Sequence, residues 1–290
     1  ATTLEQSKLC TSRVPTFGHY IGAESTLHFQ SAYFRPLHWS RVNSATTVVV
    51  ELARQKGVMR MKVSVIIVAA GKGIRLSDEG SFKQFLSLVG NPVLVHAISV
   101  FDTSPLVDEI IIVVPAEKVT YCRGLVKKYK FKKVAGVIAG GKFRQDSVYN
   151  GLLKIGKTKP DIVLIHDGVR PLVTSVLIQK CIGNIRKDGA VVLAVPVKDT
   201  IKLVRKSFVE KTLERNKLWS IQTPQCFSYD LIFKAHKKAR ADGFLGSDDA
   251  SLVERLGCPV KIEMGAGQNI KITTPEDLIL AEEILKRRGV

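Results

Sequence analysis

The alternation of two hydrophobic patterns over residues 61–290 constrains the fold more than any other feature of this sequence. Short apolar runs rich in Val and Ile have the length and composition of buried parallel strands; they lie at 63–69, 109–114, 134–139, 162–165 and 190–195. Helical periodicity fills the gaps at 93–101, 117–130, 144–155 and 175–187, the last before Gly189. Strands and helices that alternate at this spacing predict βαβ units, and therefore an α/β fold with a doubly wound, mostly parallel sheet.

A glycine-containing loop follows the first apolar run, in the stretch VAAGKGIRL at residues 68–76. Ligands of such sheets bind outside the carboxyl ends of the strands, which is where this loop begins. A dinucleotide fingerprint would need a third glycine at Leu76, and the P-loop pattern is absent too. What remains is a loop whose amides can approach phosphate oxygens, with Arg75 and Lys83 as fixed cations. The pattern suits a nucleoside triphosphate held without a Walker motif.

The composition narrows the class of protein. With 45% apolar and 24% charged residues among 290, the chain reads as an ordinary globular protein, and no apolar run approaches the roughly 18 residues of a membrane helix. The net charge of +18 suits a nucleic acid, an anionic membrane or a polyphosphate substrate. We expect no nucleic acid as a partner, because the basic residues are dispersed and no aromatic stacking platform accompanies them, and we expect no membrane as a partner either. The five scattered cysteines include no C-x-x-C pair, which favours a reducing compartment.

Residues 1–60 differ in composition from the rest. They contain seven Lys or Arg and only three acidic residues, with many Ser and Thr. This is typical of an organelle transit peptide, and it also fits an upstream extension without a fold before Met61. In either case we expect an unstructured segment at 1–60 and one domain at 61–290, located in a bacterial cytoplasm, or in a plastid if residues 1–60 are a transit peptide.

Several motifs then follow in order along the chain. After AAGKGIRL and FKQFLSLVGNPVLVHAI come GGKFRQDSVYNGL (140–152), HDGVRP (166–171), VPVKDTIK (195–202), ERNKLWSIQTPQCF (214–227), SDDASLVE (247–254) and GQNIKITTPEDL (267–278). Over essentially all of residues 61–290 the sequence resembles the 2-C-methyl-D-erythritol 4-phosphate cytidylyltransferase family. The resemblance implies a Rossmann-like sheet of the nucleotide-diphospho-sugar transferase type, with a projecting β-hairpin arm for dimerisation. The sequence departs from the family pattern at Lys142, where an acidic residue often lies, and at Phe82, where proline is usual.

The resemblance implies a reaction in the non-mevalonate isoprenoid pathway. A phosphate oxygen of 2-C-methyl-D-erythritol 4-phosphate attacks the α-phosphorus of CTP, giving 4-diphosphocytidyl-2-C-methyl-D-erythritol and pyrophosphate. A relative that acts on ribitol 5-phosphate is the alternative. Because the transition state concentrates negative charge, positioned cations should dominate catalysis, and the resemblance assigns this role to Arg75, Lys83 and Lys271.

The resemblance also implies two binding sets. Nucleotide and cofactor contacts are expected from Ala69, Ala70, Gly71, Gly73, Gly141, Arg144, Ser147, Asp167 and Gly168. Contacts to the second substrate are expected from Arg170, Thr200, Arg215, Thr223 and Ser247. On spacing alone, Gly140 and Gly141 could equally form a plain strand-to-helix turn; the resemblance favours recognition of the cytosine base.

Asp167 ends the fourth apolar run and is the candidate metal ligand. A carboxylate at that point is well placed to hold Mg²⁺, or another divalent cation, that bridges phosphate oxygens. It could instead be a turn or capping aspartate. Arg170 could reach the phosphate of the second substrate or pair with Asp167, and we expect His166 to be a packed strand residue.

The segment 197–227 interrupts the βαβ rhythm. TIKLV and SFVEKTL alternate in period two around Arg205 and Lys206, which predicts a β-hairpin that projects from the sheet. A lone hairpin is marginally stable in water and needs a partner surface. In the family this arm embraces a second subunit, so the resemblance implies a homodimer in which Arg215 reaches the neighbour's site.

Overall fold

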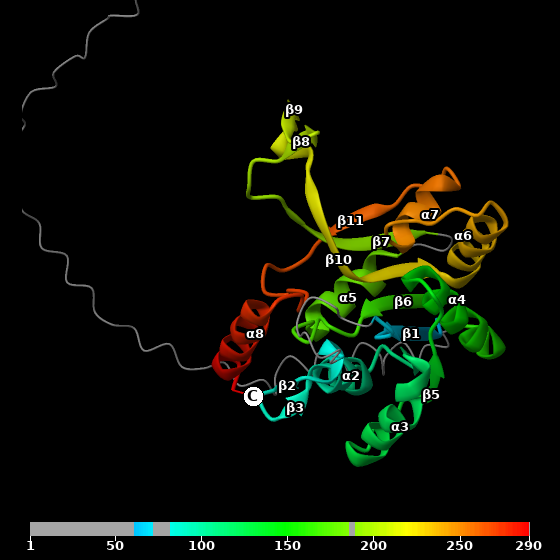
Figure 1. Cartoon of the computed structure of the whole chain (residues 1–290). Coiled ribbons are helices and arrows are strands. Elements are labelled where there is room, and N and C mark those ends of the chain that lie inside the picture. The colour runs from blue at the N-terminus through cyan, green and yellow to red at the C-terminus, as the bar shows by residue number, and fades with distance from the viewer. Residues whose placement is uncertain (1–60, 72–81, 186–188, 290) are drawn as a thin grey trace, which may run out of the picture. The chain divides into compact units, whose positions relative to one another are not determined.

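The computed structural model describes residues 61–71, 82–185 and 189–289. Their centre is a seven-stranded sheet of order β11-β7-β10-β6-β1-β4-β5 (Figure 1). Every neighbouring pair is parallel except the two that involve β10, which runs antiparallel to both β6 and β7. The strands are β1 (Val63–Val68), β4 (Glu109–Val114), β5 (Val134–Ala139), β6 (Ile162–Asp167), β7 (Ala190–Pro196), β10 (Trp219–Ser228) and β11 (Lys261–Met264). The predicted α/β fold with a mostly parallel sheet is confirmed.

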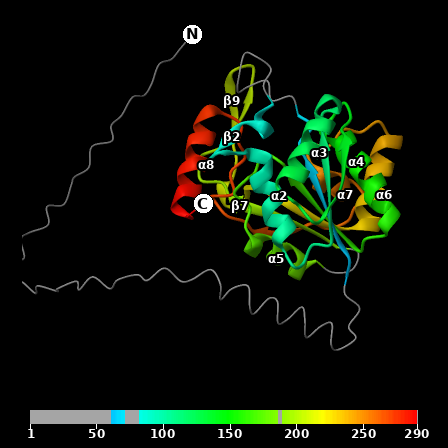
Figure 2. The ribbon, with the colours of Figure 1, turned by 90° about the horizontal axis from the view of Figure 1, so that it is seen from below.

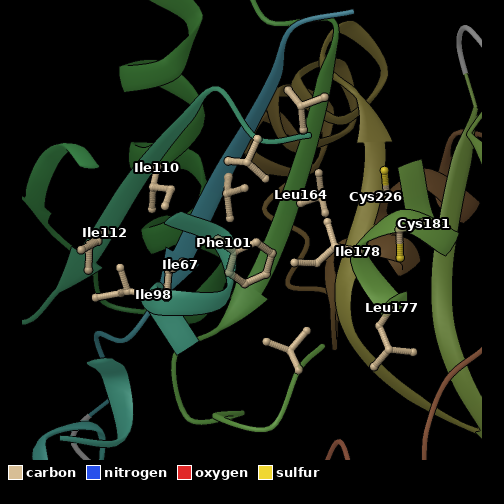
Figure 3. Packing of buried hydrophobic residues seen from close by; sticks show 14 of the residues in the cluster. Ile67, Ile98, Phe101, Ile110, Ile112, Leu164, Leu177, Ile178, Cys181 and Cys226 are labelled. Carbon is tan, nitrogen blue, oxygen red and sulfur yellow. The ribbon is translucent and has the colours of Figure 1, made fainter. Parts of the chain in front are cut away.

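The central strands are apolar because both of their faces are covered. Successive side chains of a strand point to opposite faces, and β1, β4 and β6 are buried along their whole length. In β1, Val65 and Ile67 belong to one hydrophobic cluster, whereas Ile66 and Val68 belong to another on the opposite face. Figure 3 shows the first cluster, in which Phe101 packs against the sheet. The continuous apolar runs of the sequence therefore report two-sided burial.

Helices form a layer on each face of the sheet. The face of Ile67 is covered by α2 (Val93–Thr103), α3 (Val119–Lys128) and α5 (Ser175–Asn184). The opposite face is covered by α4 (Arg144–Ile155), α6 (Tyr229–Ala241) and α7 (Asp249–Arg255), which lie together in Figure 2. The predicted helices are all present, but α5 ends before residue 187 because Ile185 is extended and buried. No helix in the described part of the chain is long and apolar enough to cross a membrane.

A smaller cluster lies beside the main sheet. Leu88, Val93, Leu172 and Ile272 pack there against the last helix, α8 (Pro275–Arg287). The short ribbon of β2 (Ser87–Leu88) and β3 (Asn91–Pro92) leads into α2. Four single turns of 3-10 helix complete the described elements: η1 (Lys83–Phe85), η2 (Ala116–Lys118), η3 (Gly156–Thr158) and η4 (Arg215–Lys217).

The predicted hairpin is present as a projecting arm, with two corrections. Its strands are β8 (Lys202–Arg205) and β9 (Phe208–Thr212), which pair only with each other (Figure 1). The turn residues are Lys206 and Ser207, whose φ angles of 47° and 70° are those of a two-residue hairpin turn, so the turn is one residue later than predicted. The arm also ends before residue 227, because β10 begins at Trp219 and its buried end pairs with β6 and β7 inside the sheet.

Candidate active site

A cavity of about 530 Å³ opens where β1, β5 and β6 end. Its size is typical of small-molecule sites. It lies at the carboxyl ends of parallel strands, where the sequence analysis predicts a ligand site. The lining comprises Val68, Ala69, Ala70, Gly71, Lys83, Gln84, Gly141, Lys142, Phe143, Arg144, Ser147, Asp167, Val169, Lys271 and Thr273. The site residues expected from the sequence that line it are Ala69, Ala70, Gly71, Lys83, Gly141, Arg144, Ser147, Asp167 and Lys271. Arg75 and Gly73 lie outside the described residues.

Glycines allow the loops after the three strands to pack closely. A Cβ placed on Gly140 would lie 2.4 Å from the Cβ of Ala70, and one on Gly168 would lie 2.8 Å from the Cβ of Ala69. Any larger residue at these two positions would push the loops apart. The hydroxyl of Ser147 accepts a 3.1 Å hydrogen bond from the Gly141 amide and donates one to the Phe143 carbonyl. Ser147 therefore fixes the turn that begins α4.

Gln84 is a site residue that the sequence analysis did not single out. Its side chain is buried, and its Nε2 donates hydrogen bonds to the carbonyl oxygens of Ala69 (2.5 Å) and Gly71 (3.2 Å). Gln84 thus ties the start of the glycine loop to η1, which also contains Lys83. A signal was available, because Gln84 follows the lysine directly in the motif FKQF, but its role depends on a contact across 15 residues.

Asp167 lies at the centre of a group of cations. Its carboxylate accepts from Arg144 Nε (3.1 Å) and from Lys271 Nζ (2.9 Å), and Arg170 Nε lies 3.8 Å away. Burial by itself would raise the pKa of Asp167, but Arg144, Lys271 and Arg170 together hold this pKa well below its usual range. Asp167 is therefore ionised at any physiological pH, and it orients two cations of the cavity lining, Arg144 and Lys271, as well as Arg170, which does not line the cavity.

His166 is a packed strand residue, as expected. Its ring is fully buried, with an edge contact to Phe101 at 5.0 Å between ring centres. The hydrogen-bond network assigns the tautomer: Nε2 donates to the Arg170 carbonyl, and Nδ1 accepts from Thr223. Burial lowers the pKa of His166 to about 4, so the ring is neutral near pH 7. Neither nitrogen is directed toward a ligand.

The substrate-binding residues expected from the sequence do not gather at this cavity. Thr223 is buried in an irregular stretch of β10, where its hydroxyl accepts from the Asp167 amide at 3.0 Å. Arg170 is nearly buried, and its Nη1 donates to the Asn269 carbonyl. Thr200, Arg215 and Ser247 are exposed and do not line the cavity. Their contacts to a substrate stay predictions.

The residues fit a divalent cation that is held mainly by a nucleotide. In the described part of the chain, no three His, Cys, Asp or Glu side chains gather as a metal site. Among the described residues that line the cavity, Asp167 is the one carboxylate. Mg²⁺ in nucleotide sites commonly binds through one or two carboxylates together with substrate phosphates, and a single ionised aspartate meets that requirement.

Comparisons with known proteins place the chain in a family. Residues 63–287 match the model of the family described as 2-C-methyl-D-erythritol 4-phosphate cytidylyltransferase. A protein of that name from Geotalea uraniireducens is 47% identical over 78% of this chain and 97% of its own length. One from Alkaliphilus oremlandii is 48% identical, over 78% of this chain and 96% of its own length.

Solved structures show the same fold. The 4-diphosphocytidyl-2C-methyl-D-erythritol synthase from Anaerococcus prevotii is 33% identical with a TM-score of 0.69, over 78% of this chain and 99% of that one. The 2-C-methyl-D-erythritol 4-phosphate cytidylyltransferase from Thermus thermophilus is 30% identical with a TM-score of 0.62, over 78% and 100%. The ribitol 5-phosphate alternative is not favoured by these matches. The chain therefore belongs to the 2-C-methyl-D-erythritol 4-phosphate cytidylyltransferase family, whose members transfer a cytidylyl group from CTP to that sugar phosphate.

Proposed function

We propose that the 530 Å³ cavity binds CTP, with its triphosphate among the lining cations. The charge of the lining supports this proposal: the described residues that line the cavity include the cations Lys83, Lys142, Arg144 and Lys271 and one carboxylate, that of Asp167. Such an excess of positive charge in a partly enclosed site suits a polyanion. The turn of Gly141 and Ser147 lies on the same wall as Arg144 and is the part that we assign to the cytosine ring.

The reaction needs little covalent chemistry from the protein. A phosphate oxygen of the sugar phosphate forms a bond to the α-phosphorus of CTP, and the bond from that phosphorus to the oxygen that bridges to the β-phosphorus breaks and releases pyrophosphate. Negative charge grows on the α-phosphate and the leaving group. Lys83 and Lys271, with Arg75 outside the described residues, are the cations that we assign to this charge. A bound Mg²⁺ would supply further positive charge, and Asp167 is the residue that would hold it.

The residues nearest the cations are poorly suited to acid–base catalysis, which supports this electrostatic mechanism. Asp167 stays ionised because its pKa is held below the usual range, and it accepts from Lys271 and Arg144. His166 is enclosed, and both of its ring nitrogens are used inside the protein. The attacking phosphate oxygen is already anionic, so the reaction requires no base to activate it.

We further propose that the arm completes the site of a second copy of the chain. Four apolar side chains of the arm are exposed, led by Phe208 at 79% and Val209 at 60%, with Leu203 and Val204 near half. At the base of the arm, Ile221 and Met264 both pair with Ala194 and are exposed too. Exposed apolar surface of this kind marks an interface. Arg215 donates to the Lys198 carbonyl on the arm and does not line the cavity of its own chain, which suits a role in the partner's site.

Two proposals concern the rest of the chain. We retain the domain boundary near residue 61, since the family match covers 63–287; residues 1–60 lie outside the described residues. For the location, a bacterial cytoplasm and a plastid are both retained, because the choice depends on whether residues 1–60 are a transit peptide.

Pyrophosphate release tests the proposed function. Purified protein is given Mg²⁺, CTP and either 2-C-methyl-D-erythritol 4-phosphate or ribitol 5-phosphate, and the same assays are repeated with UTP. We expect release with CTP and methylerythritol phosphate, which Lys83→Ala abolishes and exchange of the exposed Lys157 for Ala does not. Equal rates with UTP would remove the base-recognition proposal, and faster turnover of ribitol 5-phosphate would contradict the assignment of the second substrate.

A further inference from the structure

Arg144 is held from behind by a buried acid–histidine pair that the sequence analysis did not single out as functional. Asp249 Oδ2 accepts from Arg144 Nη1 at 2.6 Å, and Asp249 Oδ1 accepts from His236 Nε2 at 3.1 Å. The exposed fractions of the Asp249 and His236 side chains are 1% and 0%, whereas that of Arg144 is 29%. The pair therefore lies beneath Arg144, on the side away from solvent.

The hydrogen bonding of His236 indicates what the pair does. Within the described part of the chain, the ring makes one hydrogen bond, the one to Asp249, and its buried Nδ1 has no partner. An unpartnered buried polar atom costs free energy, and an apolar ring would fill the same space without that cost. The polar contribution of His236 is thus confined to orienting the carboxylate of Asp249.

Two carboxylates fix the plane of the Arg144 guanidinium. Asp167, at the end of β6, accepts a hydrogen bond from Nε, and Asp249, in α7, accepts one from Nη1. Because the guanidinium is a rigid planar fork, these two contacts also set the direction of the remaining nitrogen, Nη2. No residue in the described ranges bonds to Nη2, and Arg144 lines the cavity.

We infer that Asp249 and His236 are positioning residues for the nucleotide: they hold Arg144 so that its Nη2 is presented to the ligand in the cavity. The inference rests on the proposed function, because the ligand there is taken to be CTP. Asp249 and His236 would not touch CTP themselves and would act through Arg144.

The segment around Asp249 is held by other contacts, which makes the inference testable. Gln225 donates to Asp248 Oδ2 at 2.7 Å and accepts from the Ala250 amide at 3.2 Å. Gln145 holds the loop that precedes this segment, because its Nε2 donates to the Phe244 carbonyl and its Oε1 accepts from the Gly246 amide. Removal of the Asp249 charge should therefore leave the backbone of this segment in place while it frees Arg144.

The experiment is a double-mutant cycle read by CTP binding. Calorimetry gives the CTP dissociation constant for the wild type, Asp249→Asn, Arg144→Ala and the double variant, and steady-state kinetics give KM and kcat. Asp242→Asn is the matched control, because Asp242 also binds two cations, Lys238 and Arg255, but lies on the surface. We expect Asp249→Asn to weaken CTP binding about tenfold, within the range of coupled neighbouring residues, and to raise KM for CTP with kcat nearly unchanged.

The cycle separates a positioning role from a general structural one. If Asp249 acts through Arg144, Asp249→Asn adds no loss of CTP affinity in the Arg144→Ala background, although it still lowers the unfolding temperature. An equal loss in both backgrounds would overturn the inference. His236→Phe, which keeps a ring beside Tyr149, should show the same pattern with a smaller effect, and it decides the question if Asp249→Asn does not fold.

The failures of the two proposals are distinguishable. If Arg144→Ala leaves CTP affinity unchanged, the assignment of this cavity wall to CTP fails and the positioning inference fails with it. If Arg144→Ala weakens CTP binding while folded Asp249→Asn and His236→Phe bind CTP as the wild type does, only the positioning inference is overturned.

Discussion

Replacement of Asp167 by Asn tests the electrostatic centre of the site most directly. The variant keeps the side-chain shape but removes the charge that three cations share. Loss of the Asp167 charge affects the three cations to different degrees. Arg144 retains Asp249, and Lys271, at 41% exposed, regains water. Arg170 is 11% exposed, and its Nε has no hydrogen-bond partner, so it loses its nearest carboxylate without compensation.

These contacts set the expected magnitude. Loss of one partner of a buried ion pair costs about 3–5 kcal/mol, and we expect the lower end, about 3 kcal/mol, because Arg144 keeps Asp249 and the exposed Lys271 regains water. For a domain of this size that corresponds to a fall of roughly 6–12 °C in the unfolding temperature. Thermal and urea unfolding followed by circular dichroism in EDTA would measure the fall without a metal contribution. Asp242→Asn on the surface should change the unfolding temperature little.

The same variant also tests the metal assignment. If Asp167 holds Mg²⁺ together with the phosphates, Asp167→Asn should raise the metal concentration needed for half of the maximal rate. A lower kcat at unchanged metal dependence would assign Asp167 to positioning Arg144 and Lys271 alone. An unfolding temperature and a kcat both close to those of the wild type would refute the argument, because the partly buried Arg144 and Arg170 and the exposed Lys271 would then not depend on the charge.

Three further predictions follow from the structure. Lys83→Ala should lower kcat by at least roughly 100-fold, as loss of one transition-state contact does, with an unchanged circular dichroism spectrum; near-normal turnover would remove Lys83 from catalysis. The folded-state pKa of His166 is lowered from 6.5 to about 4, so its contribution to stability is complete above pH 6.5 and is lost as the pH falls to about 4, by about 3 kcal/mol. In urea titrations between these pH values, the free energy of unfolding of His166→Asn should depend less on pH than that of the wild type. An equal dependence would contradict the burial argument. Arg215→Ala should weaken binding of methylerythritol phosphate but not of CTP, and mixing it with Lys83→Ala should restore activity through one intact composite site; subunit exchange confirmed by mass without recovery would exclude an Arg215 that acts in the partner.

The sequence by itself determined the elements of the fold. Strands that are buried on both faces must be continuously apolar, so β1, β4 and β6 were visible as runs of Val and Ile. Helix α4 has the predicted bounds, Arg144–Ile155, because its apolar positions follow the helical period. The glycine turn before it and the cations near strand ends were visible for the same reason, since both are local in the chain.

The tertiary structure alone decided how these elements meet. Nothing local to residues 219–228 shows that β10 inserts antiparallel between β6 and β7, because the choice depends on partners more than 20 residues away. The same holds for Gln84, whose carboxamide has meaning only against the glycine loop, and for Asp249, which meets Arg144 across 105 residues. Side-chain identity is written in the sequence, but the pairing of charges and hydrogen bonds is set by long-range packing, and the chemistry of this site depends on that pairing.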